Sequence, residues 1–320
     1  MAEPQDSERL TFDTIGIREA LANKISDVTP EEYPFLSNCG SVPNPGAVRW
    51  DWLTQSLVDP VDNNLALEGD NFTTIPVEQP TRLYNYMQIS SKALAVSKTQ
   101  EAVSKAGRGS DIMRGMLRKG IELKRDMDKN LLSKQARAAG NASTVRKTST
   151  LMSWIPAANT SNGGGAAAEA TADGSDTRTD GTQRVFTETL LKDALSKVWV
   201  SSGVQGKRVV YLGEVNLTRA SGFIGLSQST NPASDRTIYG VADIYKGQHE
   251  TVYFIPERQM RARDCFIVAH AFTKIAKLRD FAPVDLPTSG DNVKKALVVE
   301  YGFQVDNPLA LGGVFDLTES

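Results

Sequence analysis

The chain has 320 residues, of which 40% are hydrophobic, and this composition excludes collagen-like, disulfide-scaffold and wholly disordered proteins. No run of ~18 apolar residues occurs, so we expect no membrane span, and the polar N-terminus is not typical of a signal peptide. Two cysteines, Cys39 and Cys265, fit a reducing compartment, although a disulfide between them stays open. The only histidines, His249 and His270, are too few for the commonest metal and acid–base sites.

The formal net charge of −2 hides three unequal blocks. Residues 1–80 carry 4 basic and 14 acidic side chains, whereas residues 81–147 carry 15 basic and 5 acidic ones. The remainder is nearly balanced, with 17 basic and 19 acidic side chains. Two solvated faces would explain this division, but it also indicates that one block meets the other or that each meets a partner. The basic block alone would favour nucleic acid, and the acidic block beside it favours protein–protein contact equally well.

The first 46 residues are typical of an arm. Residues 17–25 are compatible with one short amphipathic helix. Thr29-Pro30-Glu31-Glu32 predicts a second helix start, because a hydroxyl cap is followed by proline and then by glutamate. We expect Pro34 to end that helix almost at once, since proline lacks an amide hydrogen and restricts the residue before it.

Residues 47–96 predict two strands around a long, polar, proline-containing loop. In the first strand, Val48, Trp50 and Trp52 alternate with Arg49, Asp51 and Leu53. In the returning strand, Leu83, Met87 and Ile89 alternate with Tyr84 and Tyr86. The loop between them, with Glu68-Gly69-Asp70 inside it, is too long for a tight turn and too polar for a core. A projecting, hairpin-like segment is the expected structure.

Residues 111–139 form the strongest predicted helix. Ser110 is suited to cap its start, and Gly140-Asn141 to stop its end. Apolar side chains recur at helical spacing and predict packing on a sheet. The members of this stripe are Ile112, Met116, Leu123, Met127 and Leu131, widened by Met113, Leu117 and Ile121.

The second half of the chain mixes helices with many strands. A low-complexity segment at residues 157–182 is expected to be a surface insertion. After it we expect helices at 190–199 and 217–223 and strands at 207–212, 238–245, 251–255, 265–268, 272–278 and 296–305. This order predicts an α+β fold rather than a regular βαβ winding.

A search for reaction chemistry finds no specific motif. The chain has no Walker-type phosphate loop, no dinucleotide fingerprint and no Gly-x-Ser-x-Gly elbow, and Gly163-Gly164-Gly165 lacks the lysine that a phosphate would need. The histidines show no metal-ligand spacing, while a Cys265–His249 pair stays open. Arg258, Arg261 and Arg263 before Asp264 favour a salt-bridged strand entry over an anion site. We therefore expect no enzyme activity, no cofactor and no metal.

The order of these parts resembles the major capsid proteins of tailed bacteriophages, which have the HK-ninety-seven-like fold. The resemblance runs from about residue 12 to residue 317 and rests on several short motifs in order rather than on any one of them. These are Glu68-Gly69-Asp70, Arg82, Asn85, Gln88-Ile89-Ser90, Ser97, Thr99-Gln100-Glu101-Ala102-Val103, Ala106-Gly107, Glu122-Leu123-Lys124-Arg125-Asp126, Asp180-Gly181-Thr182-Gln183-Arg184, Arg261-Ala262-Arg263-Asp264 and Val299-Glu300-Tyr301.

The resemblance implies a domain plan. Residues 1–46 would be the N-terminal arm and 47–96 the extended loop. Residues 97–150 and 270–307 would form the peripheral domain with the spine helix 111–139, and 151–269 with 308–320 the axial domain. The resemblance also implies a virion protein, assembled in the host cytoplasm, that forms hexamers and pentamers of an icosahedral head around double-stranded DNA. Its partners would be copies of itself, the portal protein and that DNA on the inner face, with scaffolding and decoration proteins left open.

Charge and resemblance together predict where subunits meet. We expect the acidic arm and loop of one subunit to lie over basic helices of its neighbours. The expected contact residues are Trp50, Trp52, Glu68, Asp70, Arg82, Tyr84, Tyr86, Arg114, Arg118, Lys124 and Arg125. Two alternatives remain: a DNA-binding protein that uses the basic segment 108–147, and a nanocompartment shell protein of the same fold.

Overall fold

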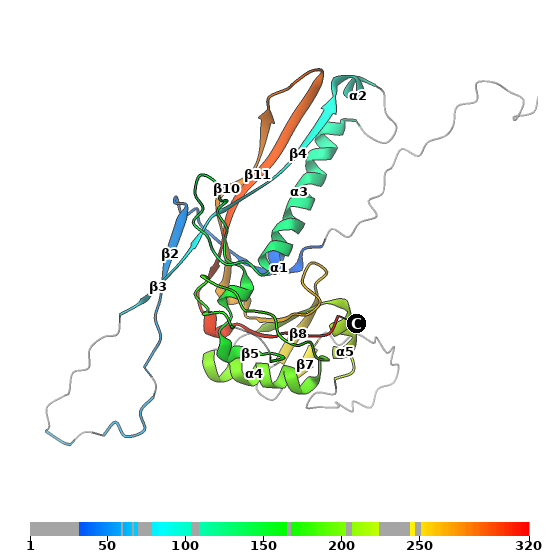
Figure 1. The fold of residues 1–320 in the computed structure, drawn as a ribbon. Coiled ribbons are helices and arrows are strands. Elements are labelled where there is room, and N and C mark those ends of the chain that lie inside the picture. Colours follow the sequence, from blue (N-terminus) through cyan, green and yellow to red (C-terminus); the bar gives the residue numbers. More distant parts are fainter. Residues whose placement is uncertain are drawn as a thin grey trace, which may run out of the picture.

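The structure is a computed structural model that describes residues 32–58, 60–65, 67–69, 79–103, 109–164, 168–202, 207–223, 244–246 and 251–319. Two sheet-centred units lie one above the other in Figure 1, and a two-stranded hairpin projects from their side. The helix expected at residues 17–25 and the cap expected at residues 29–31 lie outside the described residues.

The described chain begins with a short helix at the junction of the two units. Helix α1, Pro34–Asn38, starts with Pro34 at its first turn. The expectation that Pro34 ends a helix was therefore wrong, because the missing amide hydrogen costs nothing at the first helical position. Phe35 is fully buried, and β1, Gly40–Val42, then pairs in parallel with residues 274–276 of β10.

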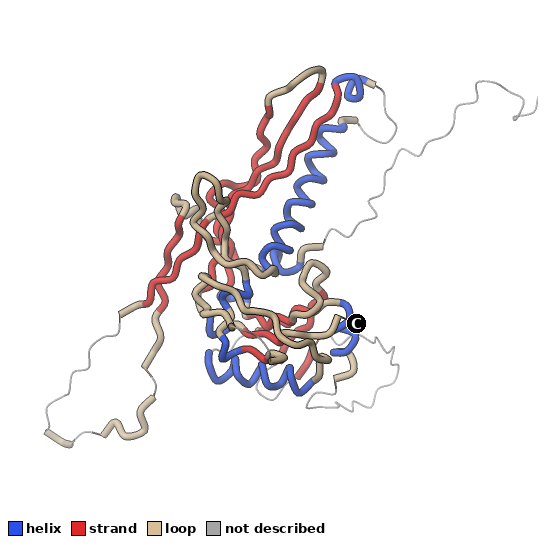
Figure 2. The backbone as a smooth tube through the Cα atoms, viewed as in Figure 1, coloured by secondary structure: helices blue, strands red, loops and turns tan. Residues whose placement is uncertain are grey.

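The upper unit is a four-stranded sheet in the order β1-β10-β11-β4. Strands β10, Thr273–Leu286, and β11, Asn292–Val305, form the long hairpin at the top of Figure 2. Strand β4, Gln88–Ser97, pairs with β11 from Gln88↔Tyr301 to Ser97↔Asn292. We expected residues 88–96 to belong to the projection, but β4 alternates between exposed and half-buried positions and lies in this sheet. The short helix α2, Lys98–Ala102, follows it.

Helix α3, Asp111–Leu131, packs across this sheet and begins where the sequence predicts. Ser110 Oγ accepts a hydrogen bond from Met113 N at 3.2 Å. The expected end at residue 139 is wrong, because the chain leaves the helix after Leu131. Residues 133–138 instead bond to a later segment: Thr150 Oγ1 donates to Ser133 O at 2.7 Å, and Ala138 pairs with Lys147. Tertiary hydrogen bonds outweigh helix propensity there.

The lower unit is a six-stranded sheet in the order β5-β12-β9-β6-β8-β7. Its strands are β5, Thr160–Ser161; β6, Arg208–Leu212; β7, Ile244–Lys246; β8, Thr251–Pro256; β9, Cys265–Val268; and β12, Gly312–Val314. Helices α4, Glu188–Ser202, and α5, Glu214–Ala220, flank it. Two short turns, η1, Leu151–Trp154, and η2, Ala157–Asn159, precede β5. Two others link the units: η3, His270–Phe272, leads from β9 to β10, and η4, Pro308–Ala310, leads from β11 to β12. The C-terminal strand β12 thus sits inside the sheet, between β5 and β9.

Most strands of the second half are confirmed, but the expected surface insertion at residues 157–182 is wrong. Strand β5 and the side chain of Arg178, which is only 1% exposed, lie inside this segment. Arg178 bonds Asp316, which is fully buried, with an Nη2–Oδ2 distance of 2.7 Å. Arg261 and Arg263 belong to the same ion-pair cluster, as the salt-bridge interpretation predicted, whereas Arg258 is exposed. Both cysteines are free.

Candidate intersubunit surfaces

The projecting hairpin consists of β2, Arg49–Thr54, and β3, Thr81–Tyr86, paired from Arg49↔Tyr86 to Thr54↔Thr81. The described parts of the loop that joins them carry an unusual number of exposed apolar side chains. Their exposed fractions are Leu57 95%, Val58 66%, Val61 68%, Leu65 87% and Leu67 80%. Such a row of large apolar side chains in water marks an interaction surface.

Two tryptophans fix the base of this hairpin to the body. Trp52 is only 9% exposed, its Nε1 donates to Val305 O at 2.9 Å, and its ring lies 5.5 Å from that of Trp154. Trp50 is half-buried and packs edge-on against Trp52. Trp52 therefore buries its surface within its own chain, which leaves little of it for a neighbouring subunit.

Tyr84 is also engaged within the chain. Its ring lies between two guanidinium groups, with Arg49 at 3.9 Å and Arg137 at 3.8 Å from the centroid. Arg137 in turn donates to Tyr84 O at 3.2 Å and pairs with Asp173 at 3.3 Å. Tyr86 packs edge-on against Tyr84 at 5.9 Å. This stack ties the hairpin to the loop that follows α3 and sets its direction.

The charged residues expected on the projection are differently placed. Arg82 is exposed and bonds Asp51 on the neighbouring strand. Partial burial acts to raise the pKa of Asp51, but hydrogen bonds from Arg82 and Arg49 outweigh it and hold this pKa below its usual value. Glu68 is exposed in a turn before Gly69, whose φ of +84° favours glycine. Asp70 lies outside the described residues.

Helix α3 presents a second apolar patch. Met113 and Leu117 are each 70% exposed, and their spacing of four residues places them side by side on the helix. Sequence reasoning assigned both to the packed stripe, which was wrong, because the sheet covers only the face with Leu123, Met127 and Leu131. Arg114 and Arg118 follow them one position along and flank the patch.

The other two basic residues expected to make contacts lie farther along α3. Lys124 Nζ faces the rings of Tyr33 and Phe281 at 5.3 and 5.9 Å from their centroids. Arg125 is half-buried, and its Nε has no hydrogen-bond partner among the described residues. The hairpin points away from α3 in Figure 1, so that the two groups of expected contact residues are not brought together within one chain.

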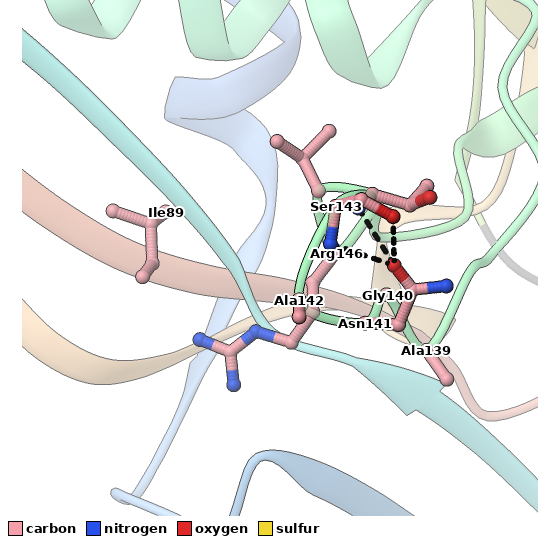
Figure 3. A pocket seen from close by; sticks show the side chains of 9 residues that line it. Ile89, Ala139, Gly140, Asn141, Ala142, Ser143 and Arg146 are labelled. Carbon is pink, nitrogen blue, oxygen red and sulfur yellow. Dashed lines mark hydrogen bonds between the residues drawn. The ribbon is translucent and has the colours of Figure 1, made fainter.

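A pocket of about 500 Å³ at the surface offers no reactive constellation. It lies between Ile89 and the loop of residues 139–146 (Figure 3). Asn141 Oδ1 accepts hydrogen bonds from Ser143 N, Ser143 Oγ and Thr144 N at 2.8 to 3.0 Å, so the polar groups are satisfied inside the loop. Arg146 pairs with Glu300 at 2.6 Å. Across the described residues, no cluster of metal-ligating side chains occurs, and no helix is long and apolar enough to cross a membrane.

Capsid chains are among the solved structures that superpose on this chain. The capsid of an empty GTA particle superposes with a TM-score of 0.61 at 14% identity, covering 94% of this chain and 96% of that one. The capsid of the Cyanophage P-SCSP1u superposes with a TM-score of 0.55 at 10% identity, covering 97% of each chain. At such identities the likeness concerns the fold, which is the expected α+β, HK-ninety-seven-like capsid fold.

Residues 5–318 match the model of the SU10 major capsid protein family, and the chain belongs to this family. It is also 33% identical over 128 residues to the major capsid protein of Escherichia phage Phieco32. That stretch covers 40% of this chain and 36% of the relative, so the chain matches little more than a third of the relative's length. The resemblance to phage major capsid proteins is thereby confirmed.

Proposed function

We propose that the chain assembles with copies of itself into the hexamers and pentamers of an icosahedral phage head around double-stranded DNA. The upper unit with α3 would be the peripheral domain and the lower unit the axial domain. The proposal includes the portal protein and the DNA as partners, and a place in the virion after assembly in the host cytoplasm. A catalytic role has no support in the described side chains.

One observation carries the proposal: the loop of the hairpin exposes five large apolar side chains that the described residues of its own chain leave uncovered. Burying a Leu or Val fully is worth about 1.5–3 kcal/mol, which a free subunit forgoes. A matching surface exists on α3, where Met113 and Leu117 are flanked by Arg114 and Arg118. We place the loop of one subunit over this patch of its neighbour.

Charge is expected to guide this contact rather than to supply its strength. Glu68 and Asp70 bring negative charge to the loop, whereas α3 carries six basic and four acidic side chains, with Arg114 and Arg118 beside the apolar patch. A single surface ion pair contributes only about 0–1 kcal/mol, so opposite charge chiefly speeds encounter and fixes register. Apolar burial by the loop supplies most of the affinity.

The DNA-binding alternative is less well supported by the same helix. Lys119 pairs with Glu122 at 2.7 Å, and Lys92 of β4 reaches Asp126 at 2.8 Å, so acidic side chains interrupt the basic face. A nucleic-acid surface would need a continuous row of cations along the phosphates. Membership of the capsid family also disfavours a free DNA-binding role.

The apolar loop can be tested directly. Leu65→Ser together with Leu67→Ser should leave the subunit folded, because both side chains already lie in water. We expect particles from the parent chain in negative-stain images, and only capsomers or monomers from the variant. Val200→Ser, which changes an equally exposed side chain on α4 (72%), is the matched control and should still form particles. Normal particles from the double variant would contradict the proposal.

The charge component is tested by reversing signs on one side and then on both. Glu68→Lys with Asp70→Lys should slow assembly, and added salt should then speed it, because attraction between opposite charges is replaced by repulsion that salt screens. Adding Arg114→Glu and Arg118→Glu should restore the rate. If the reversed loop assembles as fast as the parent chain and with the same salt dependence, loop charge does not guide the contact.

A further inference from the structure

Two buried carboxyl groups meet beside α1, away from the surfaces discussed above. Asp128, on α3, is fully buried, and Glu257, which follows β8, keeps only 2% of its surface exposed. Within the part of the chain that the structure describes, no ion pair joins either carboxyl to a basic side chain. Burying an unpaired carboxylate costs much free energy, so this pair must be stabilised by hydrogen bonds or by a bound proton.

Backbone amides donate hydrogen bonds to one oxygen of each carboxyl group. Leu36 N of α1 donates to Asp128 Oδ1 at 2.6 Å, and Gln259 N donates to Glu257 Oε1 at 2.9 Å. The backbone N–H of Phe35 also bonds Glu257. The first amides of α1 that follow Pro34 are therefore held by two carboxyl groups from two different units of the fold.

The second oxygen of each carboxyl group lacks such a donor in the described part of the chain. Asp128 Oδ2 and Glu257 Oε2 are buried and find no donor among the described residues. The two carboxyl groups are nevertheless close enough for a hydrogen bond between them. Two carboxylates have no hydrogen to share, so a hydrogen bond between these two groups requires one bound proton.

The electrostatics of the site agree with a single shared proton. Burial, followed by the charge of Glu257, raises the pKa of Asp128 to about 8, and burial also raises the pKa of Glu257. Other titratable groups that face the site are neutral near pH 7. Burial raises the pKa of Cys39 to about 12, raises that of Tyr211, and lowers that of His270 to about 4. Of the nearby cations, Lys124 faces aromatic rings, and Arg258 is exposed.

The carboxyl pair lies where α1 packs against the rest of the chain. Phe35 is fully buried, with its ring 5.5 Å from that of Tyr211 on β6 and 6.0 Å from that of Phe303 on β11. Asn38 Nδ2 donates to Tyr211 Oη at 3.0 Å, and Tyr211 Oη bonds His270 Nε2 at 2.7 Å. Helix α1 thus joins α3 and both sheets at one point, next to the carboxyl pair (Figure 1).

We propose that Asp128 and Glu257 form a proton-operated latch that seats α1 at the junction of the two units. With one shared proton the pair is a hydrogen-bonded unit of charge −1 that accepts the α1 amides. When the proton leaves to solvent, two carboxylates face each other in a buried site, repel, and release α1. Docking of the segment from Pro34 to Cys39 is then governed by pH, independently of how the shell is assembled.

The direction of the pH effect follows from linkage. A carboxyl with a pKa of about 8 when α1 is docked and the usual 3.8 when it is not binds one more proton in the docked form, so docking weakens as pH rises between these values. His270, with a pKa of about 4 when buried and 6.5 when exposed, strengthens docking with rising pH over the lower part of that range. The two effects cancel up to about pH 6.5, and docking weakens about tenfold per pH unit from there to about pH 8.

Hydrogen exchange of the full-length chain, followed by mass spectrometry, tests this latch. After correction for intrinsic exchange, protection of the amides of residues 35–39 should be level below about pH 6.5, fall about tenfold per unit to about pH 8, and then level off. Asp128→Asn keeps a hydrogen-bond donor without an ionisable proton and should abolish the fall. Asp126→Asn, which removes an exposed carboxylate from the same helix, should keep it.

Two outcomes of the exchange experiment would overturn the latch: a fall that persists in Asp128→Asn, or no fall in the parent chain. If Asp128→Asn does not fold, Glu257→Gln provides the same test from the other side of the pair. Infrared difference spectra of the parent chain give an independent reading. They should show a protonated carboxyl near pH 7 that is lost with a midpoint near pH 8, and its absence would equally refute the proposal.

Discussion

At the scale of single residues, the strongest constraint on the lower unit is the buried ion pair of Arg178 and Asp316. Besides Asp316, Arg178 contacts Glu169 at 3.2 Å, and Asp316 also accepts hydrogen bonds from Gly181 N at 2.7 Å and Gly163 N at 3.1 Å. Although burial works against ionisation, these donors lower the pKa of Asp316 to about 2. The pair and its neighbours fasten the C-terminal segment to Gly163, Glu169 and Gly181.

Removing one partner of this pair should be costly. Arg178→Met removes the closest charged partner of Asp316 and leaves Arg263, at 3.1 Å, as its remaining one. We therefore expect the free energy of unfolding to fall by about 2–3 kcal/mol in denaturant titrations, somewhat less than for a fully unpaired buried charge. The control is Lys192→Met, which breaks the surface pair with Glu188 on α4 and should cost at most about 1 kcal/mol. Equal effects of the two substitutions would show that burial of the pair is immaterial.

Sequence reasoning could not have found either buried site. Arg178 and Asp316 lie 138 positions apart, and Asp128 and Glu257 lie on different units, so neither pair leaves a local pattern. The Gly- and Ala-rich composition around Arg178 even suggested a surface loop. By contrast, Arg261 and Arg263 could be interpreted correctly, because their clustering beside Asp264 indicates local ion pairs.

At the scale of elements, α3 approaches the sheet closely through two glycines. A Cβ added at Gly115 would lie 3.0 Å from Leu94 Cδ2, whereas one added at Gly120 would make an ordinary contact of 3.7 Å with Leu297 Cδ2. Glycine lowers helix stability by about 1 kcal/mol relative to alanine, so a substitution without steric conflict is favourable.

The two glycines therefore make a matched pair of substitutions. Gly120→Ala should raise the free energy of unfolding by about 0.5–1 kcal/mol, because it gains helix propensity without crowding. Gly115→Ala should gain less or lose stability, since Leu94 must move. Denaturant titration of both variants decides the matter, and a larger gain from Gly115→Ala would contradict the packing described for α3 and β4.

The direction of the hairpin depends on the stack of Arg49, Tyr84 and Arg137. Tyr84→Leu removes two cation–π contacts, worth about 0.5–2 kcal/mol each, and should increase hydrogen exchange in β2 and β3 without unfolding the chain. Tyr84→Phe keeps the ring and should exchange like the parent chain. If both variants exchange alike, the stack does not hold the hairpin.

The misjudged element boundaries have a common cause. The end of α3 and the length of β10 are set by distant partners rather than by local sequence. Residues 279–286 of β10 are mostly exposed and include Pro283, and such a sequence is typical of a loop. Pro283 is tolerated because β1 pairs only with residues 274–276, so the far part of β10 is an edge with no amide bond to lose. Helix α4 and strands β6 and β9 were predicted correctly, because regular apolar spacing in the local sequence marks their buried faces.

At the scale of the whole molecule, near-neutrality is the sum of an acidic block and a basic block. The structure keeps the loop of the hairpin and α3 apart within one chain, while each of them exposes large apolar side chains. We propose that a subunit built in this way covers those surfaces with other copies of itself, which agrees with its membership of a capsid family.

The most direct test of this account is a reconstruction of the assembled particle by electron cryomicroscopy. It should show residues 57–67 of one subunit covering Met113 and Leu117 of a neighbouring subunit, with Glu68 near Arg114 or Arg118. A particle in which the loop and this patch of α3 both remain open to solvent would contradict the account.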